Sequence, residues 1–174
     1  MKIAIGLGAS LGPRRDTLER TVQQLHAHAD CTIVRVSRWY RSAPMRGGTA
    51  SGLFLNGVAV VDTTLRPRAL LAVCQDLEED AGRRRARYWG DRTLDLDLLY
   101  AEGAEDDATD LTLPHPGLWS RPFVYWPLWE AWPDLRPLLR QRPAPPRHGI
   151  VAVGAFARAA LTPYAPSPLP EHPR

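Results

Sequence analysis

Lysine is almost absent from this sequence, because Lys2 is the only lysine among 22 lysine and arginine residues. The P-loop that cradles nucleotide phosphates ends in Gly-Lys-Ser or Gly-Lys-Thr, so this absence excludes a P-loop enzyme. Residues 6–12 have nearly the glycine spacing of a dinucleotide-binding fingerprint, but the third glycine comes one position late, and we interpret the stretch as a tight turn between a strand and a helix. The sequence also lacks the glycine-loop motifs of protein kinases and any Cys/His pattern typical of zinc sites.

Cysteine is scarce, and Cys31 and Cys74 both lie among apolar residues, which indicates buried thiols in a reducing compartment rather than a disulfide framework. No apolar run approaches the length that spans a membrane. Residues 1–6 enter a strand-like run directly, so we expect no signal peptide and a cytoplasmic protein. A net charge of +3 is too small to predict nucleic-acid binding, although many arginines suit small anionic ligands.

The apolar pattern predicts a β-α-β-β-α-β order within an α+β protein. The predicted elements are a strand over 3–7, a helix from Pro13, strands over 32–40 and 54–63, a helix from Pro67 to about Ala81, and a strand carrying Asp95 and Asp97. This order is typical of the ferredoxin-like fold, in which both helices cover one face of an antiparallel sheet. We therefore expect the active site on the other face.

The rest of the chain is expected to be less regular. Two long connections, 41–52 and 83–92, border the open face of the sheet, and loops of this length are often functional. Residues 102–110 are acidic and predict an exposed loop, whereas the aromatic block 125–132 predicts a short helix packed on the domain. We expect a single domain over 1–142, followed by a proline-rich and partly disordered extension over 143–174.

The most informative motif is Asp95-Leu96-Asp97. Strand side chains alternate between faces, so Leu94, Leu96 and Leu98 point one way and both aspartates the other. Two carboxylates on one face repel each other unless a cation lies between them, and oxygen ligands suit a hard divalent ion such as Mg²⁺. Taken alone, the same motif is also typical of a solvent-facing sheet edge.

Arginines crowd the segment before these aspartates, at positions 83–85, 87 and 92. Guanidinium groups are well suited to phosphate oxygens, although such a run can equally form a solvated loop. Arginines next to a pair of carboxylates indicate phosphoryl-type transfer from a nucleotide.

The stretch Trp89-Gly90-Asp91-Arg92-Thr93-Leu94-Asp95-Leu96-Asp97-Leu98-Leu99 resembles the signature of the 6-hydroxymethyl-7,8-dihydropterin pyrophosphokinase family. Further matches follow in order: Trp39-Tyr40-Arg41-Ser42-Ala43-Pro44, Phe54-Leu55-Asn56, Gln75 with Glu78, Gly82-Arg83, Leu113-Pro114-His115, and Arg121-Pro122-Phe123. The resemblance covers roughly residues 3–135, nearly the whole globular part of the chain. The resemblance also implies the ferredoxin-like fold.

The resemblance implies transfer of the diphosphate of ATP to the hydroxymethyl oxygen of the reduced pterin in folate biosynthesis, with release of AMP. Asp95 and Asp97 would hold two Mg²⁺ ions, and Asp97 would also take the hydroxyl proton. Arg83, Arg92 and Asp97 would act in catalysis. The partners would be ATP and the pterin, with no nucleic acid and no membrane, and the protein would be a monomer.

Two binding sets are implied by the same resemblance. The residues that would bind ATP are Gln75, Glu78, Arg85, Trp89, Arg92, Leu98, Thr112, His115 and Arg121. The residues that would bind the pterin are Ser42, Ala43, Met45, Phe54, Asn56, Trp89, Asp95 and Phe123, with the two phenylalanines stacked on its ring.

The sequence departs from the family at a few positions. Tyr88 and Asp110 replace basic residues, and Asp91 replaces a proline or small residue and puts a negative charge beside Arg92. We expect these changes to affect ATP affinity and the geometry of 83–92. Two other functions stay open: a pterin-binding regulator without turnover, and a ferredoxin-like nucleic-acid module, although the third strand lacks the aromatic motif of RNA-binding sheets.

Overall fold

The fold is that of a computed structural model, which describes residues 1–45, 49–82, 90–157 and 161. Its main feature is a six-stranded antiparallel sheet in the order β5-β1-β4-β3-β8, with β2 paired to the second half of β4. The strands are β1 (Lys2–Ala9), β2 (Cys31–Val36), β3 (Arg38–Ser42), β4 (Phe54–Thr63), β5 (Asp95–Ala101) and β8 (Ile150–Ala155).

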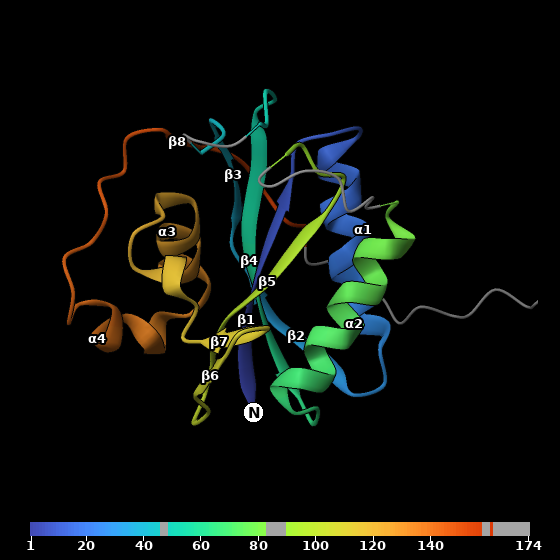
Figure 1. The fold of residues 1–174 in the computed structure, drawn as a ribbon, viewed down its shortest axis with the longest axis vertical. Helices are drawn as coiled ribbons and strands as arrows, with labels where there is room; N and C mark the ends of the chain where they lie inside the picture. Colours follow the sequence, from blue (N-terminus) through green and yellow to red (C-terminus); the bar gives the residue numbers. More distant parts are fainter. Residues whose placement is uncertain (46–48, 83–89, 158–160, 162–174) are drawn as a thin grey trace, which may run out of the picture.

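Helices lie on both sides of this sheet (Figure 1). On one side are α1 (Arg14–Ala27) and α2 (Pro67–Asp80), and on the other are α3 (Pro122–Ala131) and the short α4 (Arg136–Leu139). The chain is therefore an α+β protein with three layers.

The two long helices form where the apolar spacing predicts them. Leu18, Val22 and Leu25 of α1 are completely buried against the sheet. Pro67 occupies the first turn of α2, where its missing N–H removes no helical hydrogen bond. Gly82 follows α2 with a φ of 76°, a left-handed conformation that favours glycine at a helix C-terminus.

Each side of the sheet has its own hydrophobic core. The first, called here the α1–α2 core, contains Ile3, Ile5, Leu70 and Cys74. The second, called the α3 core, is formed by the opposite sheet face and the aromatic helix α3, and includes Val58, Leu99, Leu118, Tyr125, Leu128 and Trp132. The predicted packing role of the aromatic block 125–132 is confirmed.

The single strand expected over 32–40 is in fact two strands, and that prediction is wrong at Ser37. The Ser37 hydroxyl accepts a hydrogen bond from the N–H of Val58 at 3.0 Å and donates one to the carbonyl of Arg38 at 2.7 Å. These local bonds replace the regular ladder, so β2 and β3 pair with different halves of β4.

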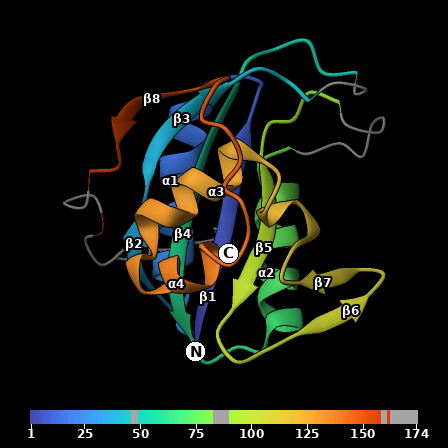
Figure 2. The ribbon, with the colours of Figure 1, turned by 90° about the vertical axis from the view of Figure 1, so that its left-hand side faces the viewer.

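The acidic stretch 102–110 is not simply a loop, as we expected. It contributes β6 (Asp106–Ala108), which pairs with β7 (Leu111–Leu113) in a hairpin that projects beside β5 (Figure 2). Arg68 of α2 ties this hairpin down, with ion pairs of 3.3 Å to Asp106 and 2.7 Å to Asp110.

The segment after residue 142 also contributes to the sheet. β8 pairs with the edge of β3, and Phe156 beyond it packs edge-on against the buried Trp39, with ring centroids 6.4 Å apart. No helix within the described part of the chain is long and apolar enough to cross a membrane.

Candidate active site

Asp95 and Asp97 lie at the start of β5 and face away from α1 and α2. Leu96 and Leu98 between and beyond them point into the α1–α2 core. The predicted alternation is therefore confirmed over this part of the strand. At Leu99 a β-bulge shifts the register against β1, and the side chain packs in the α3 core instead.

The two aspartates line a cavity of about 290 Å³ on the face of the sheet that carries the α3 core. This volume is near the lower end of the range for ligand pockets. The cavity brings together residues predicted from five separate stretches of the chain. Those that line it are Ser42, Ala43, Met45, Phe54, Asn56, Arg92, Asp95, Asp97, His115, Arg121 and Phe123.

Glycines of β1 form the floor of this cavity. Gly6 pairs with Asp97 and Gly8 with Asp95 across the β1–β5 ladder, and both glycines line the cavity. A Cβ atom on Gly8 would lie 3.4 Å from Oδ1 of Asn56 and 3.9 Å from the Cβ of Asp95. The missing side chain of Gly8 thus leaves the space between Asn56 and Asp95 open.

Gly6 lies in β1, in agreement with the strand predicted over 3–7, but our interpretation as a turn is wrong for Gly8, which also lies inside β1. The turn begins only at Ser10, where the strand ends. The available signal was the spacing of two, because Ile5 and Leu7 flank Gly6 and point into the α1–α2 core.

Asp97 is in the most charged part of the cavity. Burial raises the pKa of its carboxyl above the usual range, and the nearby charge of Asp95 adds to the rise. His115, Arg121 and Arg92 act in the opposite sense, because positive charge favours the carboxylate. A divalent cation bound between the two aspartates would relieve the repulsion between their carboxylates.

His115 is fixed at the start of the short 3₁₀ helix η1 (Pro116–Leu118). Its Nδ1 accepts a hydrogen bond from the N–H of Gly117 at 2.9 Å, and its main-chain N–H donates to the carbonyl of Leu99 at 2.8 Å. Burial lowers the pKa of the imidazole, although the charge of Asp97 partly offsets this. A neutral ring with Nδ1 as acceptor carries its proton on Nε2, which is then a donor.

Arg121 precedes α3 and folds back over Gly117. A Cβ atom on Gly117 would lie 2.6 Å from Nε of Arg121, so a larger residue there would displace the Arg121 side chain from this position. Sequence reasoning did not identify Gly117, because its role depends on a side chain from the next element.

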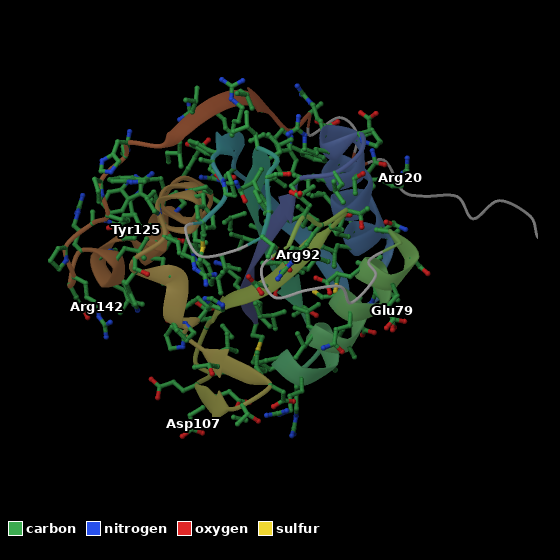
Figure 3. All side chains as sticks on the ribbon, turned by 45° about the horizontal axis from the view of Figure 1, so that its top comes forward. Arg20, Glu79, Arg92, Asp107, Tyr125 and Arg142 are labelled. Carbon is green, nitrogen blue, oxygen red and sulfur yellow. The ribbon has the colours of Figure 1, made fainter. Side chains whose placement is uncertain are left out.

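Arg92 is anchored at both its main chain and its side chain. Its N–H donates to Oγ of Ser10 at 2.9 Å, and its carbonyl accepts from the N–H of Ser10 at 2.9 Å. Its guanidinium forms an ion pair with Asp95. In Figure 3 the labelled Arg92 lies near the centre of the molecule, beside the sheet.

Asn56 of β4 is 6% exposed and its amide is oriented by two acceptors. Nδ2 donates to Oγ of Ser42 at 3.0 Å and to the carbonyl of Tyr40 at 3.4 Å. Because both partners are acceptors, these bonds assign the positions of Nδ2 and Oδ1, and Oδ1 lies on the side of Gly8.

The donor set fits a hard cation that is shared with a ligand. Two carboxylates from one strand face the same cavity, and oxygen ligands suit Mg²⁺. No group of three or more His, Cys, Asp or Glu side chains placed to hold a metal occurs within the described ranges. Mg²⁺ typically binds through one or two carboxylates and takes its other ligands from water and substrate phosphates, so this pair is sufficient.

Four predicted ATP-binding residues do not line the cavity. Glu78 is 6% exposed, and its Oε1 accepts the N–H of Leu96 at 2.6 Å from the other side of the sheet. Leu98 is buried in the α1–α2 core, whereas Gln75 and Thr112 are exposed on α2 and β7. Arg83, Arg85 and Trp89, together with the departure at Tyr88, fall outside the described residues.

The two departures that are described have local partners. The Asp91 carboxylate accepts hydrogen bonds from Ser51 and Gly52, which hold the pKa of this carboxyl below its usual range. Asp110 pairs with Arg68, outside the cavity. Each negative charge is thus engaged by a group other than Arg92.

Comparison with known proteins gives one consistent family. The model of the family described as 7,8-dihydro-6-hydroxymethylpterin-pyrophosphokinase (HPPK) matches residues 4–133. A protein of Methylorubrum extorquens called 2-amino-4-hydroxy-6-hydroxymethyldihydropteridine pyrophosphokinase is 40% identical over 131 residues, which are 75% of this chain and 82% of that protein. The protein of the same name from Bacillus subtilis is 38% identical over 126 residues, 72% of this chain and 75% of its own length.

Solved structures agree at the level of the fold. The crystal structure of Plasmodium falciparum HPPK-DHPS A437G with pteroate matches with a TM-score of 0.53 and 12% identity, over 80% of this chain and 42% of that chain. At this identity the likeness concerns the fold alone.

Proposed function

This chain belongs to the 7,8-dihydro-6-hydroxymethylpterin-pyrophosphokinase family, and we propose that the cavity beside Asp95 and Asp97 is where its reaction takes place. The reaction transfers the diphosphate of ATP to 6-hydroxymethyl-7,8-dihydropterin in folate biosynthesis and releases AMP. The observation that carries the proposal is that one cavity holds a pair of carboxylates, two arginines, a histidine, an asparagine and two phenylalanines.

The pterin side is formed by Phe54, Phe123 and Asn56. Flat conjugated rings stack well on aromatic faces, so the two phenylalanines would hold the pterin between them. Asn56 would recognise the polar edge of the ring, because its amide is held in one orientation by Ser42. Main-chain groups around Ala43 would complete this edge.

The phosphate side is formed by Arg92, Arg121 and His115, which would bind the anionic oxygens of ATP. Asp95 and Asp97 would hold Mg²⁺, in our proposal two ions. When bound, Mg²⁺ would neutralise charge on the transferring phosphates and align them. The rest of the nucleotide would extend outside the cavity, toward α2 and β7, where Gln75 and Thr112 are exposed.

In the step itself, the hydroxymethyl oxygen would attack the β-phosphorus while the bond from that phosphorus to the α-phosphate oxygen breaks and AMP leaves. Asp97 would take the hydroxyl proton, because it lines the same cavity as the groups that would hold the phosphates and the pterin. Arg92 and Arg121 would stabilise the charge that moves onto the departing phosphate oxygen.

We also propose that the fold is ferredoxin-like, that residues 1–142 carry the activity, and that the protein works as a monomer in the cytoplasm. The sheet order β5-β1-β4 followed by β2 and β3, with both long helices on one face, supports the first point. Cys31 and Cys74 are free thiols, as expected in a reducing compartment.

The experiment is an assay with ATP, Mg²⁺ and 6-hydroxymethyl-7,8-dihydropterin that separates AMP from ADP. We expect AMP and the pterin diphosphate in equal amounts, and no AMP when EDTA removes the metal. Formation of ADP would contradict diphosphate transfer. Pterin binding without any nucleotide product would favour the alternative of a regulator.

A further inference from the structure

Two segments that are distant in the sequence meet at Asp91, beside the cavity. Oδ2 of Asp91 accepts hydrogen bonds of 3.2 Å from both the N–H and the hydroxyl of Ser51. Oδ1 accepts a third, also of 3.2 Å, from the N–H of Gly52. One carboxylate therefore connects the segment that leads into β5 with the segment that leads into β4.

Each connected segment continues into a different side of the cavity. Gly52 is followed closely by Phe54, on the side assigned to the pterin, and Ala50 on the same segment also lines the cavity. Asp91 is followed by Arg92, on the side assigned to the phosphates, whose guanidinium pairs with Asp95.

A third segment makes the junction tight. Ser10, just after β1, is hydrogen-bonded to the main chain of Arg92 in both directions. A Cβ atom on Gly52 would lie 3.2 Å from Oδ1 of Asp91 and 3.3 Å from the carbonyl of Ser10. Gly52 thus fits closely between the two groups, which restricts how these segments can move relative to one another.

We propose that Asp91 is a positioning residue that couples the two substrate sides of the cavity. It joins segment 49–52 to Arg92, so that a substrate that orders one segment also orders the other. The second substrate then pays less of the entropy of ordering, and its affinity rises. The proposal rests on the proposed function, because it takes the pterin and ATP as the two ligands.

The charge of Asp91 agrees with this role. Two main-chain N–H groups and a hydroxyl all donate to it, and such donors favour the ionised form of a carboxyl group. The negative charge is satisfied by the segment that it holds. Asp91 therefore links the two segments, and its negative charge is engaged by Ser51 and Gly52 rather than by Arg92.

The test measures binding with two unreactive ligands, oxidised 6-hydroxymethylpterin and α,β-methylene-ATP with Mg²⁺. Calorimetry gives the Kd of the pterin with and without saturating nucleotide, and the ratio of the two is the coupling factor. We expect a factor well above one for the wild-type protein. In Asp91→Ala it should fall by roughly threefold to tenfold, the range for hydrogen bonds to a partly exposed charged group.

Graded variants separate coupling from folding. Ser51→Ala removes one of the three bonds and should lose less of the coupling than Asp91→Ala. Asp91→Asn keeps one oxygen acceptor, so its coupling factor should lie between those of the wild-type protein and Asp91→Ala. Asp107→Ala makes the same charge change on the exposed hairpin far from Arg92 (Figure 3) and should keep the wild-type factor.

A wild-type coupling factor in Asp91→Ala, or a factor of one in the wild-type protein, would overturn the proposal. If Asp91→Ala does not fold, Ser51→Ala and Asp91→Asn decide the question in the same way. Failure of the proposed function is detected separately, in the assay with ATP, Mg²⁺ and 6-hydroxymethyl-7,8-dihydropterin, because the wild-type protein would then form no AMP.

Discussion

At the scale of single residues, the proposed mechanism depends most on Asp97. It lies beside Asp95 in the cavity and has three cationic or titratable neighbours, so its charge matters to every group around it. Replacing it by an isosteric amide removes that charge with little change in packing.

We therefore expect Asp97→Asn to reduce AMP formation by about a hundredfold or more, because in our proposal it removes both a metal ligand and the proton acceptor. The melting temperature should stay close to that of the wild-type protein. The exposed Asp62→Asn is a matched control and should keep full activity. Wild-type turnover in Asp97→Asn would rule out its assignment to the metal and to the proton.

The glycine floor gives a second prediction. Gly8→Val should reduce kcat/KM by at least about tenfold, since a loss of ~1.4 kcal/mol in transition-state binding corresponds to that factor. The free energy of unfolding should change by less than about 1 kcal/mol, because valine suits a strand. The side chain would occupy the space between Asn56 and Asp95.

Gly103→Ala is the reverse control. Gly103 lies outside the cavity with a φ of 70°, where a side chain costs about 1–2 kcal/mol. It should therefore lose stability and keep its turnover. If Gly8→Val instead lost stability and kept its turnover, Gly8 would be a structural residue only.

What the sequence could predict at this scale depended on chemistry that a residue carries in itself. Asp95 and Asp97 could be named as candidate site residues, because strand alternation and charge repulsion are both local properties of the sequence. Gly8 has no side chain to signal its role. The partner of Asp91 could not be predicted, because Ser51 comes from a segment that only the fold brings near.

At the scale of elements, α2 and β5 are joined by a buried carboxylate. Glu78 accepts the N–H of Leu96, the residue between the two aspartates of the cavity. This bond holds β5 from the side of α2, while the two aspartates face the cavity.

We expect Glu78→Ala to lower the free energy of unfolding by about 1–3 kcal/mol, because a buried N–H loses its acceptor. Glu78→Gln keeps an oxygen in place and should lose much less. Urea unfolding of both variants makes the comparison. If both keep wild-type stability and raise the KM for ATP alone, Glu78 would act on the nucleotide, as the family resemblance implied.

Elements with long regular patterns were predicted well, and short ones were not. β4 has the predicted bounds, and both long helices begin near the predicted prolines. The hairpin of β6 and β7 was missed because three residues a strand are too few to show a period. The break at Ser37 depends on a side-chain bond to β4, which no local pattern reveals.

At the scale of the whole molecule, the sheet is completed by its last strand. β8 covers the edge of β3, including Ser42 at the cavity, and Phe156 contacts Trp39 in the α1–α2 core. An uncovered edge would expose unpaired main-chain groups.

We expect Phe156→Ala to lower the melting temperature by about 3 °C, from a loss of about 1 kcal/mol in aromatic packing. Val151→Ala is the control, since Val151 is 53% exposed on β8 and its change should stay within about 0.5 kcal/mol. Scanning calorimetry compares the two. Equal melting temperatures would mean that the contact with Trp39 contributes little.

The order of strands and helices along the chain followed from the sequence because each long element carries its own apolar pattern. The position of β8 did not, since its partner β3 lies far upstream and the segment between is rich in proline. The order of elements also gave no sign that α3 covers the second sheet face, although the aromatic content of α3 predicted that this helix is packed on the domain.

The glycines of β1 have a consequence for inhibition. A ligand that rests on Gly6 and Gly8 touches main-chain atoms, and no mutation can trim a main chain. Every substitution there adds atoms and takes space from the natural substrate as well as from the inhibitor. A compound confined to this floor would therefore leave resistance few routes that do not also harm the enzyme.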